Sequence, residues 1–254
     1  MGSVSRRIFL KASGAVALTP AAADAATRAA DAAAAKPSAS AAAAPQGYLF
    51  FNAPEAAFIE AAVQRLIPPD DVGPGALEAG VPTYIDRQLH GAWGAGEKLY
   101  RAGPWAAGTP SQGYQLPYTP AELFRTALRG VRDDLQKTRQ TSFEKLSGEE
   151  QDGYLTELQN GTRDLAGVPS KVFFESLLAS TIEGYFCDPV YGGNKDMAAW
   201  KMIGFPGAYA AYYDLVDRHG VAFTGAPRSL GEDGHGHIHP MPVATAAAPA
   251  RKAR

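Results

Sequence analysis

Three kinds of side chain in this sequence could do chemistry: histidines, carboxylates and a single cysteine. His235, His237 and His239 occupy alternate positions near the C-terminus, and imidazoles spaced in this way on an extended segment can converge on a transition metal. The tract lies among glycines and prolines, outside the predicted packed region. We expect weak or incidental metal binding there, with a functional metal site as the alternative.

Two carboxylates, Glu183 and Asp188, flank the end of a long apolar segment and could form an acid and base pair. Carboxylates at a helix end beside a glycine-rich turn more often accept hydrogen bonds from local backbone amides, which is the role we predict. His90 and His219 each precede a glycine, where an imidazole can satisfy the last carbonyls of a helix. We assign no catalytic residue to this chain.

Motifs that hold cofactors are missing from the sequence. A bound flavin would call for a Gly-x-Gly-x-x-Gly turn between a strand and a helix, whereas Gly73-x-Gly75 and Gly94-x-Gly96 lack the third glycine. One cysteine can neither hold an iron-sulfur cluster nor form a Cys-x-x-Cys-His haem attachment. We therefore expect this chain to carry no cofactor of its own.

Charge argues against a nucleic-acid partner, and hydropathy excludes a membrane span. The 254 residues hold 24 basic and 26 acidic side chains, but residues 48–248 hold 16 basic and 24 acidic ones. An acidic body without clustered Lys and Arg argues against nucleic acid as a partner. No stretch reaches the ~20 consecutive apolar residues that cross a bilayer.

The N-terminus resembles a twin-arginine export signal. Arg6 and Arg7 precede Ile-Phe-Leu-Lys and a weakly apolar stretch, and small residues around 23–26 offer cleavage sites. We predict a signal peptide over 1–26 and an Ala/Pro/Ser-rich linker over 27–47, which has no large apolar residue to pack. The expected compartment is the periplasm, reached by a route that carries proteins already folded.

Helical patterns dominate the rest of the chain, so we predict a mainly α fold. Capping boxes begin helices at Asn52, Thr119 and Ser147, and a second apolar row runs from Leu77 to a stop at Gly91, with a bend at Pro82. The helix from Ser170 is apolar over most of its circumference, which makes it central. Its two apolar rows are Phe173-Leu177-Thr181-Tyr185 and Phe174-Leu178-Ile182-Phe186.

Other segments are predicted to be irregular or solvent-facing. Residues 91–117 form a long Gly/Pro/aromatic-rich loop that could lie across a partner, and 197–203 and 209–215 are short helical segments. Arg125, Arg129 and Arg132 are interpreted as a solvated helix face. No useful strand pattern competes with these helices. From 226 to 254 we expect a flexible tail.

Cys187 is the only cysteine, so an internal disulfide is excluded although the expected compartment is oxidising. A lone thiol in an exported protein is either buried and inert or bonded to another chain. Both alternatives stay open at this stage.

The segment after the central helix resembles a known family. It reads Thr181-Ile-Glu-Gly-Tyr-Phe-Cys-Asp-Pro-Val-Tyr-Gly-Gly-Asn194, followed by Trp200 and Gly204-Phe-Pro-Gly207. With Ile67-Pro68, Gly73-Pro-Gly75-Ala76 and Tyr84-Ile85-Asp86, it is similar to the small subunit, or subunit 3, of gluconate 2-dehydrogenase. The resemblance covers roughly residues 50–210, and we expect a subunit 3-like domain over 48–225.

The resemblance implies an all-helical subunit that is not itself catalytic. Its implied partners are a large flavoprotein of the glucose-methanol-choline type and a multihaem cytochrome c, so FAD, an iron-sulfur cluster and haem c belong to the partners, in a complex associated with the inner membrane. The large subunit would be stabilised and co-exported by this chain. The alternative is a stand-alone periplasmic binding or metal-handling protein that uses the histidine tract.

Turn chemistry in the motif places aromatic side chains on an irregular surface, which suits them as interface anchors. The alternative is that these rings fill the subunit's own core. The predicted partner interface, with a disulfide through Cys187 as one option, comprises Glu183, Tyr185, Phe186, Cys187, Asp188, Pro189, Tyr191, Gly192, Gly193, Asn194, Trp200 and Phe205.

Overall fold

The structure, a computed structural model, describes residues 47–106, 108–109, 115–209 and 212–243. All the elements described below lie in the unit that begins at Tyr48. Six α-helices and one two-stranded sheet make up its regular structure in the described residues, which confirms the predicted mainly α class. The predicted leader and most of the linker, including Arg6 and Arg7, lie outside the described residues.

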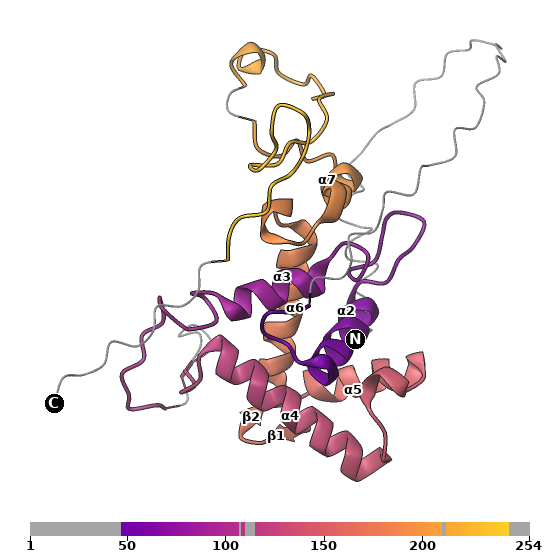
Figure 1. Cartoon of the computed structure of the whole chain (residues 1–254), viewed down its shortest axis with the longest axis vertical. Coiled ribbons are helices and arrows are strands. Elements are labelled where there is room, and N and C mark those ends of the chain that lie inside the picture. Colours follow the sequence, from indigo (N-terminus) through magenta and orange to yellow (C-terminus); the bar gives the residue numbers. More distant parts are fainter. Residues whose placement is uncertain (1–46, 107, 110–114, 210–211, 244–254) are drawn as a thin grey trace. The chain divides into compact units, whose positions relative to one another are not determined.

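The helices and strands follow one another in a simple order (Figure 1). The α-helices are α2 (Ala53–Leu66), α3 (Val81–His90), α4 (Pro120–Arg139), α5 (Gly148–Gln159), α6 (Ser170–Phe186) and α7 (Ala198–Ile203). The short 3-10 helices are η2 (Phe143–Lys145), η3 (Pro189–Tyr191), η4 (Lys195–Met197) and η5 (Tyr213–Leu215). The antiparallel strands β1 (Asp164–Leu165) and β2 (Val168–Pro169) pair Leu165 with Val168.

Local sequence explains where three of these helices begin. The side chains of Asn52, Thr119 and Ser147 each accept a hydrogen bond from the backbone amide three residues on, and the glutamate carboxylate at that position accepts one from the cap residue's amide. The reciprocal pair satisfies two of the amide donors that a helix start leaves open. All three predicted capping boxes are confirmed.

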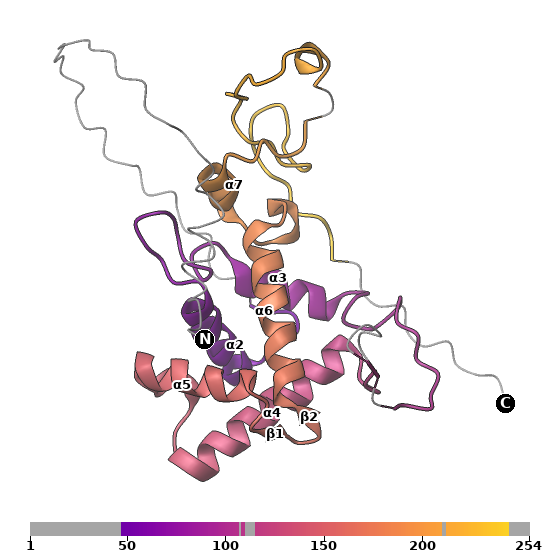
Figure 2. The same cartoon turned by 180° about the vertical axis from the view of Figure 1, so that it is seen from behind.

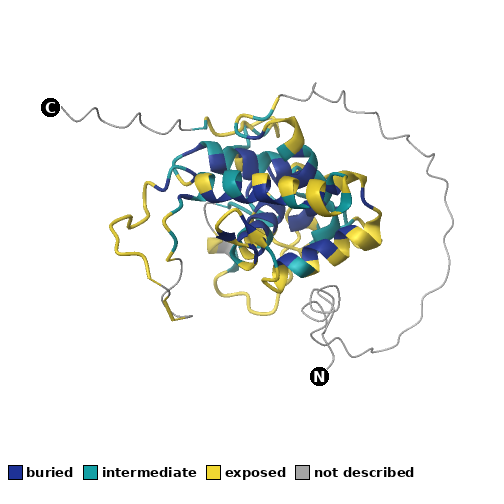
Figure 3. Ribbon diagram, turned by 90° about the horizontal axis from the view of Figure 1, so that it is seen from below, coloured by how far each residue is buried: buried dark blue, intermediate teal, exposed yellow. Residues whose placement is uncertain are grey.

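Helix α6 is the central element, and α3 and α5 pack most extensively against it. It crosses behind α3 in Figure 1 and in front of it in Figure 2. The row from Phe173 to Tyr185 is buried throughout, whereas the second row emerges gradually until Ile182 is 45% exposed. Buried positions concentrate where the helices face one another (Figure 3), so the central position predicted for this helix is confirmed and its C-terminal end is partly uncovered.

The second predicted helix begins later than the apolar row indicated. Leu77 lies in a turn and is 41% exposed, and α3 begins only at Val81. Gly80 separates them because it adopts φ 79°, a left-handed conformation that favours glycine. Pro82 consequently stands in the first turn, where it is tolerated without a bend.

A hairpin that the sequence pattern did not indicate packs on α4. Strands β1 and β2 both contact this helix, and Gly130 permits the close approach, since a Cβ there would stand 2.7 Å from the backbone of Leu165. The strands have only two residues each, too few for an alternating pattern to be recognised. The prediction that no strand competes with the helices therefore needs this small correction.

One carboxylate binds the start of the domain to α3. Asp86 of α3 is 2% exposed and accepts the backbone N–H groups of Leu49, Phe50 and Phe51 at 2.7, 2.8 and 2.9 Å. A buried carboxylate needs such donors to offset its loss of water. The segment before α2 is therefore tied to α3.

The described parts of the long loop after α3 contain turns and bends but no helix, as predicted. The segment predicted as helical over 209–215 forms only the short η5 in its described part. Among the helices of the described residues, none combines the length and apolar character that a membrane span requires.

Candidate functional site

The two motif regions of the sequence meet in the structure. The hydroxyl of Tyr185, near the end of α6, donates to the carbonyl of Pro74 at 2.7 Å, and the amide of Lys195 donates to the carbonyl of Ala79 at 3.0 Å. Gly73 leaves room for Met202, whose sulfur would stand 3.0 Å from a Cβ at that position. Residues 67–86 and 181–207 therefore form one local assembly.

Glycines let the chain fold back tightly after α6. A Cβ on Gly193 would stand 2.1 Å from the carbonyl oxygen of Gly184, and a Cβ on Gly184 would stand 2.7 Å from the ring of Tyr84. Gly192 adopts φ 100°, which a residue with a side chain rarely does. The Gly192-Gly193 pair is thus required by close backbone contact and by turn geometry.

Asn194 ties this turn to its neighbours. The side chain is fully buried, its amide donates to the carbonyl of Cys187 at 2.9 Å, and its oxygen accepts the amide of Ala199 at 2.9 Å. The indole of Trp200 donates to the carbonyl of Phe186 at 2.7 Å. These bonds fix α7 against the end of α6.

Asp188 acts as a backbone acceptor, in keeping with the role we predicted for helix-end carboxylates. One oxygen accepts the amide of Val190 at 3.0 Å and the hydroxyl of Ser229 at 2.5 Å, and the other accepts the amide of Leu230 at 2.8 Å. Glu183 differs, since its carboxylate accepts the hydroxyl of Tyr84 at 3.4 Å. Neither arrangement brings the two carboxylates together as an acid and base pair.

The C-terminal segment from 226 needs a correction for its described part, 226–243. The sequence placed it outside the packed region, but Ser229 is buried against Asp188, and Arg228 forms a parallel bridge with Gly207. The amide of Met241 donates to the carbonyl of Val190 at 3.0 Å. These contacts are made by single residues far apart in sequence, so no local pattern could have indicated them.

The predicted interface residues divide by burial. Six are buried within this chain and hold the turn together: Tyr185, Asp188, Pro189, Gly193, Asn194 and Trp200. Phe186, Cys187 and Gly192 are partly buried. Glu183 is exposed, as are Tyr191 and Phe205, at 38% and 44%. Tyr185 and Trp200 therefore fill the subunit's own core, which is the alternative kept open above. Tyr191 and Phe205 are accessible to a partner.

The comparison with protein families decides what kind of protein carries this assembly. A family model described as gluconate 2-dehydrogenase subunit 3 matches residues 53–207, which is more than half of the chain. The chain belongs to this family. No curated protein and no solved structure matches it.

The match extends from the first residue of α2 to Gly207 and so includes both motif regions. The role is accordingly that of a gluconate 2-dehydrogenase subunit 3, a subunit of a dehydrogenase assembled from several chains. The C-terminal segment bound to Asp188 lies beyond the family match, and so does the histidine tract.

Cys187 carries a free thiol that is partly buried in the family motif. Its sulfur donates to the carbonyl of Gly184 at 3.3 Å. Burial raises the pKa of the thiol from an ordinary value near 9 to about 11, because the thiolate loses hydration. This environment favours an unreactive thiol, and a disulfide to a partner stays a prediction.

The histidine tract is organised around a carboxylate. Asp233 accepts the backbone amides of His235 and His237 at 2.8 and 2.9 Å and contacts the ring of His239 at 2.9 Å. These bonds, the one to His239 foremost, hold the pKa of the Asp233 carboxyl well below its usual range. Within 47–243, apart from the undescribed gaps, no three potential ligands are grouped to hold a metal ion.

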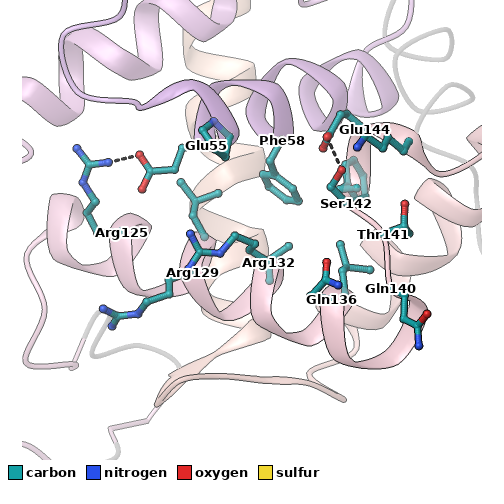
Figure 4. Close-up of a pocket in the computed structure, with 16 residues that line it drawn as sticks. Glu55, Phe58, Arg125, Arg129, Arg132, Gln136, Gln140, Thr141, Ser142 and Glu144 are labelled. Atoms are coloured by element: carbon teal, nitrogen blue, oxygen red, sulfur yellow. Dashed lines mark hydrogen bonds and ion pairs between the residues drawn. The ribbon is translucent and has the colours of Figure 1, made fainter.

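One cavity was not anticipated from the sequence. A groove of about 730 Å³ lies between α2 and α4, with Phe58 and Leu128 among its lining residues. Figure 4 shows Arg125 turned toward Glu55, with which it forms an ion pair. The same guanidinium donates to the carbonyl of Phe50, and its Cζ lies 4.0 Å from the centroid of the Phe50 ring. Arg129 and Arg132 are exposed, as predicted for a solvated face, whereas the Arg125 side chain is 42% exposed and is also paired with Glu55.

Proposed function

We propose that this chain binds and stabilises the flavin-carrying subunit of an acceptor-linked dehydrogenase for sugars or sugar acids, and that the two are exported together. The observation that carries the proposal is a set of exposed apolar side chains on the segments that hold the family motif. Ile203 and Phe205 are 56% and 44% exposed, and Ile182 and Tyr191 are 45% and 38% exposed.

The backbone beneath these side chains supports an anchoring role. Trp200 contacts Phe205 edge to face at 5.0 Å between ring centroids, and Asn194 and Gly193 fix the turn that precedes them. Apolar groups held on a rigid backbone lose little conformational entropy when a partner covers them. The buried members of the motif shape this surface, and the exposed members contact the flavoprotein.

A direct test replaces exposed side chains without disturbing the core. The Ile203→Ser/Phe205→Ser double variant should weaken binding of the flavin-containing subunit by at least about tenfold, since two apolar anchors are lost. Tyr213→Ser is the matched control, because Tyr213 is 86% exposed and lies beyond the family match. Equal affinities for the double variant and the wild-type chain would contradict the proposal.

Co-export depends on the leader and is tested there. Arg6 and Arg7 form the twin-arginine pair, and replacing both with Lys should retain the flavoprotein in the cytoplasm together with this chain. Dehydrogenase activity and flavin are measured in periplasmic and cytoplasmic fractions. If the flavoprotein reaches the periplasm at its normal level, it travels independently of this chain.

A further inference from the structure

Arg87 has a buried side-chain donor that no described residue satisfies. It stands in the last turn of α3, and its side chain lies along the turn after α6, since a Cβ on Gly192 would stand 3.2 Å from its Cδ and 3.4 Å from its Nε. The Nη1 atom is buried and has no hydrogen-bond partner among the described residues. A buried guanidinium donor without an acceptor is costly.

Nearby carboxylates of the chain do not supply that acceptor. Asp86, the preceding residue, is occupied by three backbone amides. Glu183, on the facing end of α6, binds the hydroxyl of Tyr84 at 3.4 Å, and no ion pair joins it to Arg87 among the described residues. The positive charge beside Gly192 is therefore left unmatched within this part of the chain.

The position of Arg87 connects it to the proposed interface. The Arg87 side chain lies along the turn from Pro189 to Asn194, which belongs to the family motif. Tyr191 in that turn is exposed. Tyr84, one helical turn before Arg87, contacts the same end of α6 through Gly184 and Glu183. Arg87 as a whole residue is only partly buried, so its side chain lies at a junction between α3 and α6 that borders solvent.

We propose that Arg87 is the anchor for a carboxylate of the flavin-carrying subunit, which enters beside Gly192 and accepts hydrogen bonds from the guanidinium. This inference rests on the proposed function, because it names one contact within that interface. A carboxylate fits better than a neutral carbonyl, since charge-assisted hydrogen bonds are roughly twice as strong as neutral ones. Its arrival offsets a positive charge that the described part of the free subunit leaves without a carboxylate.

Affinity and stability together test this role. Arg87→Met keeps much of the apolar stem but removes the donors, so it should weaken binding of the flavin-containing subunit by about 30-fold or more. The thermal midpoint of the isolated full-length chain should stay the same or rise, because an unsatisfied buried group has been removed. Arg129→Met, an exposed arginine on α4, is the matched control and should change neither quantity.

Two results would overturn the proposal. One is an affinity of Arg87→Met within twofold of wild type. The other is a lowered thermal midpoint that accounts for the weaker binding, which would assign Arg87 a purely structural role. If the wild-type chain itself does not bind the flavin-containing subunit, the proposed function fails and the Arg87 contact fails with it. This outcome is distinguishable from the two results above, in which the wild-type chain binds.

A crosslinking experiment identifies the acceptor. In Arg87→Lys, the introduced amine can be joined to an adjacent carboxylate by a carbodiimide, and mass spectrometry should find an Asp or Glu of the flavin-containing subunit at the junction. Arg129→Lys should give no such product. A crosslink from position 87 to a carboxylate of this same chain would contradict the proposal.

Discussion

The hydroxyl of Ser229 donates a 2.5 Å hydrogen bond to the carboxylate of Asp188, 41 positions earlier in the chain. Asp188 belongs to the family motif, whereas Ser229 lies beyond the family match. The bond therefore joins a segment beyond the family match to a turn within it. Several measurable consequences depend on contacts of this kind.

Asp188→Asn should release the C-terminal segment. The amide nitrogen cannot accept, so the amide of Leu230 or the hydroxyl of Ser229 loses its acceptor, at a cost of about 1–3 kcal/mol. Hydrogen exchange at Leu230 and Met241 should accelerate, while exchange within α6 stays unchanged. Asp196→Asn, an exposed position in η4, is the control, and equal exchange in both variants would contradict the anchoring role.

The raised pKa of Cys187 predicts low thiol reactivity. With a pKa of about 11 against an ordinary value near 9, the thiolate fraction at pH 8 is about 100-fold smaller in the folded chain than in the unfolded chain. Reaction with a thiol reagent should be slow and should accelerate on denaturation. Since the folded pKa is the higher one, the thiol's contribution to stability is complete below pH 9 and is lost as the pH rises toward 11.

An intersubunit disulfide through Cys187, the other option for this thiol, can be tested directly. A disulfide would require the sulfur to leave its contact with the Gly184 carbonyl and reach a partner. Non-reducing electrophoresis of the purified complex checks this, and the absence of a linked species would rule the disulfide out.

Gly193→Ala should be strongly destabilising. The new methyl group would stand 2.1 Å from the carbonyl oxygen of Gly184 and 3.0 Å from the sulfur of Cys187, so backbone must shift, at a cost of roughly 2–4 kcal/mol. Gly153→Ala is the control, because a Cβ there meets nothing within 4 Å and the site is inside α5. That variant should gain about 0.5–1 kcal/mol, and urea unfolding measures both.

Asp86→Ala should detach the start of the domain. Three backbone amides lose a charged acceptor, and the free energy of unfolding should fall by on the order of 3 kcal/mol. Hydrogen exchange should increase at Leu49, Phe50 and Phe51. Asp133→Ala, on the exposed face of α4, serves as the control, and a similar small loss in both would assign Asp86 a minor role.

Local rules predicted much of the fold. The capping boxes at Asn52, Thr119 and Ser147 depend on residues three apart, and the buried row of α6 depends on helical periodicity, so both can be read from adjacent positions. The start of α3 could not be predicted in this way. The apolar spacing that begins at Leu77 runs on into α3 without interruption. The helix nevertheless begins only at Val81, because Gly80 adopts a left-handed conformation.

The contacts that sequence reasoning missed are nonlocal. Arg125 looked like part of a solvated face because its helix neighbours are polar, and only the approach of Glu55 and Phe50 gives it partners. Ser229 reaches Asp188 from outside the family motif for a similar reason. Burial of the Arg87 Nη1 without an acceptor in the described part of the chain also depends on how α3 meets the turn after α6. The motif located the candidate site, but not which of its members are buried.

The three hydrogen bonds at Asp86 give this domain a mechanical boundary. A pull applied to the chain ahead of Tyr48 would be borne by the amides of Leu49, Phe50 and Phe51, which bind Asp86 of α3, and by the hydroxyl of Tyr48, which donates to Glu60 of α2 at 2.6 Å. Residues ahead of Tyr48 can therefore be pulled, cleaved or replaced while the helices that follow these hydrogen bonds keep their packing.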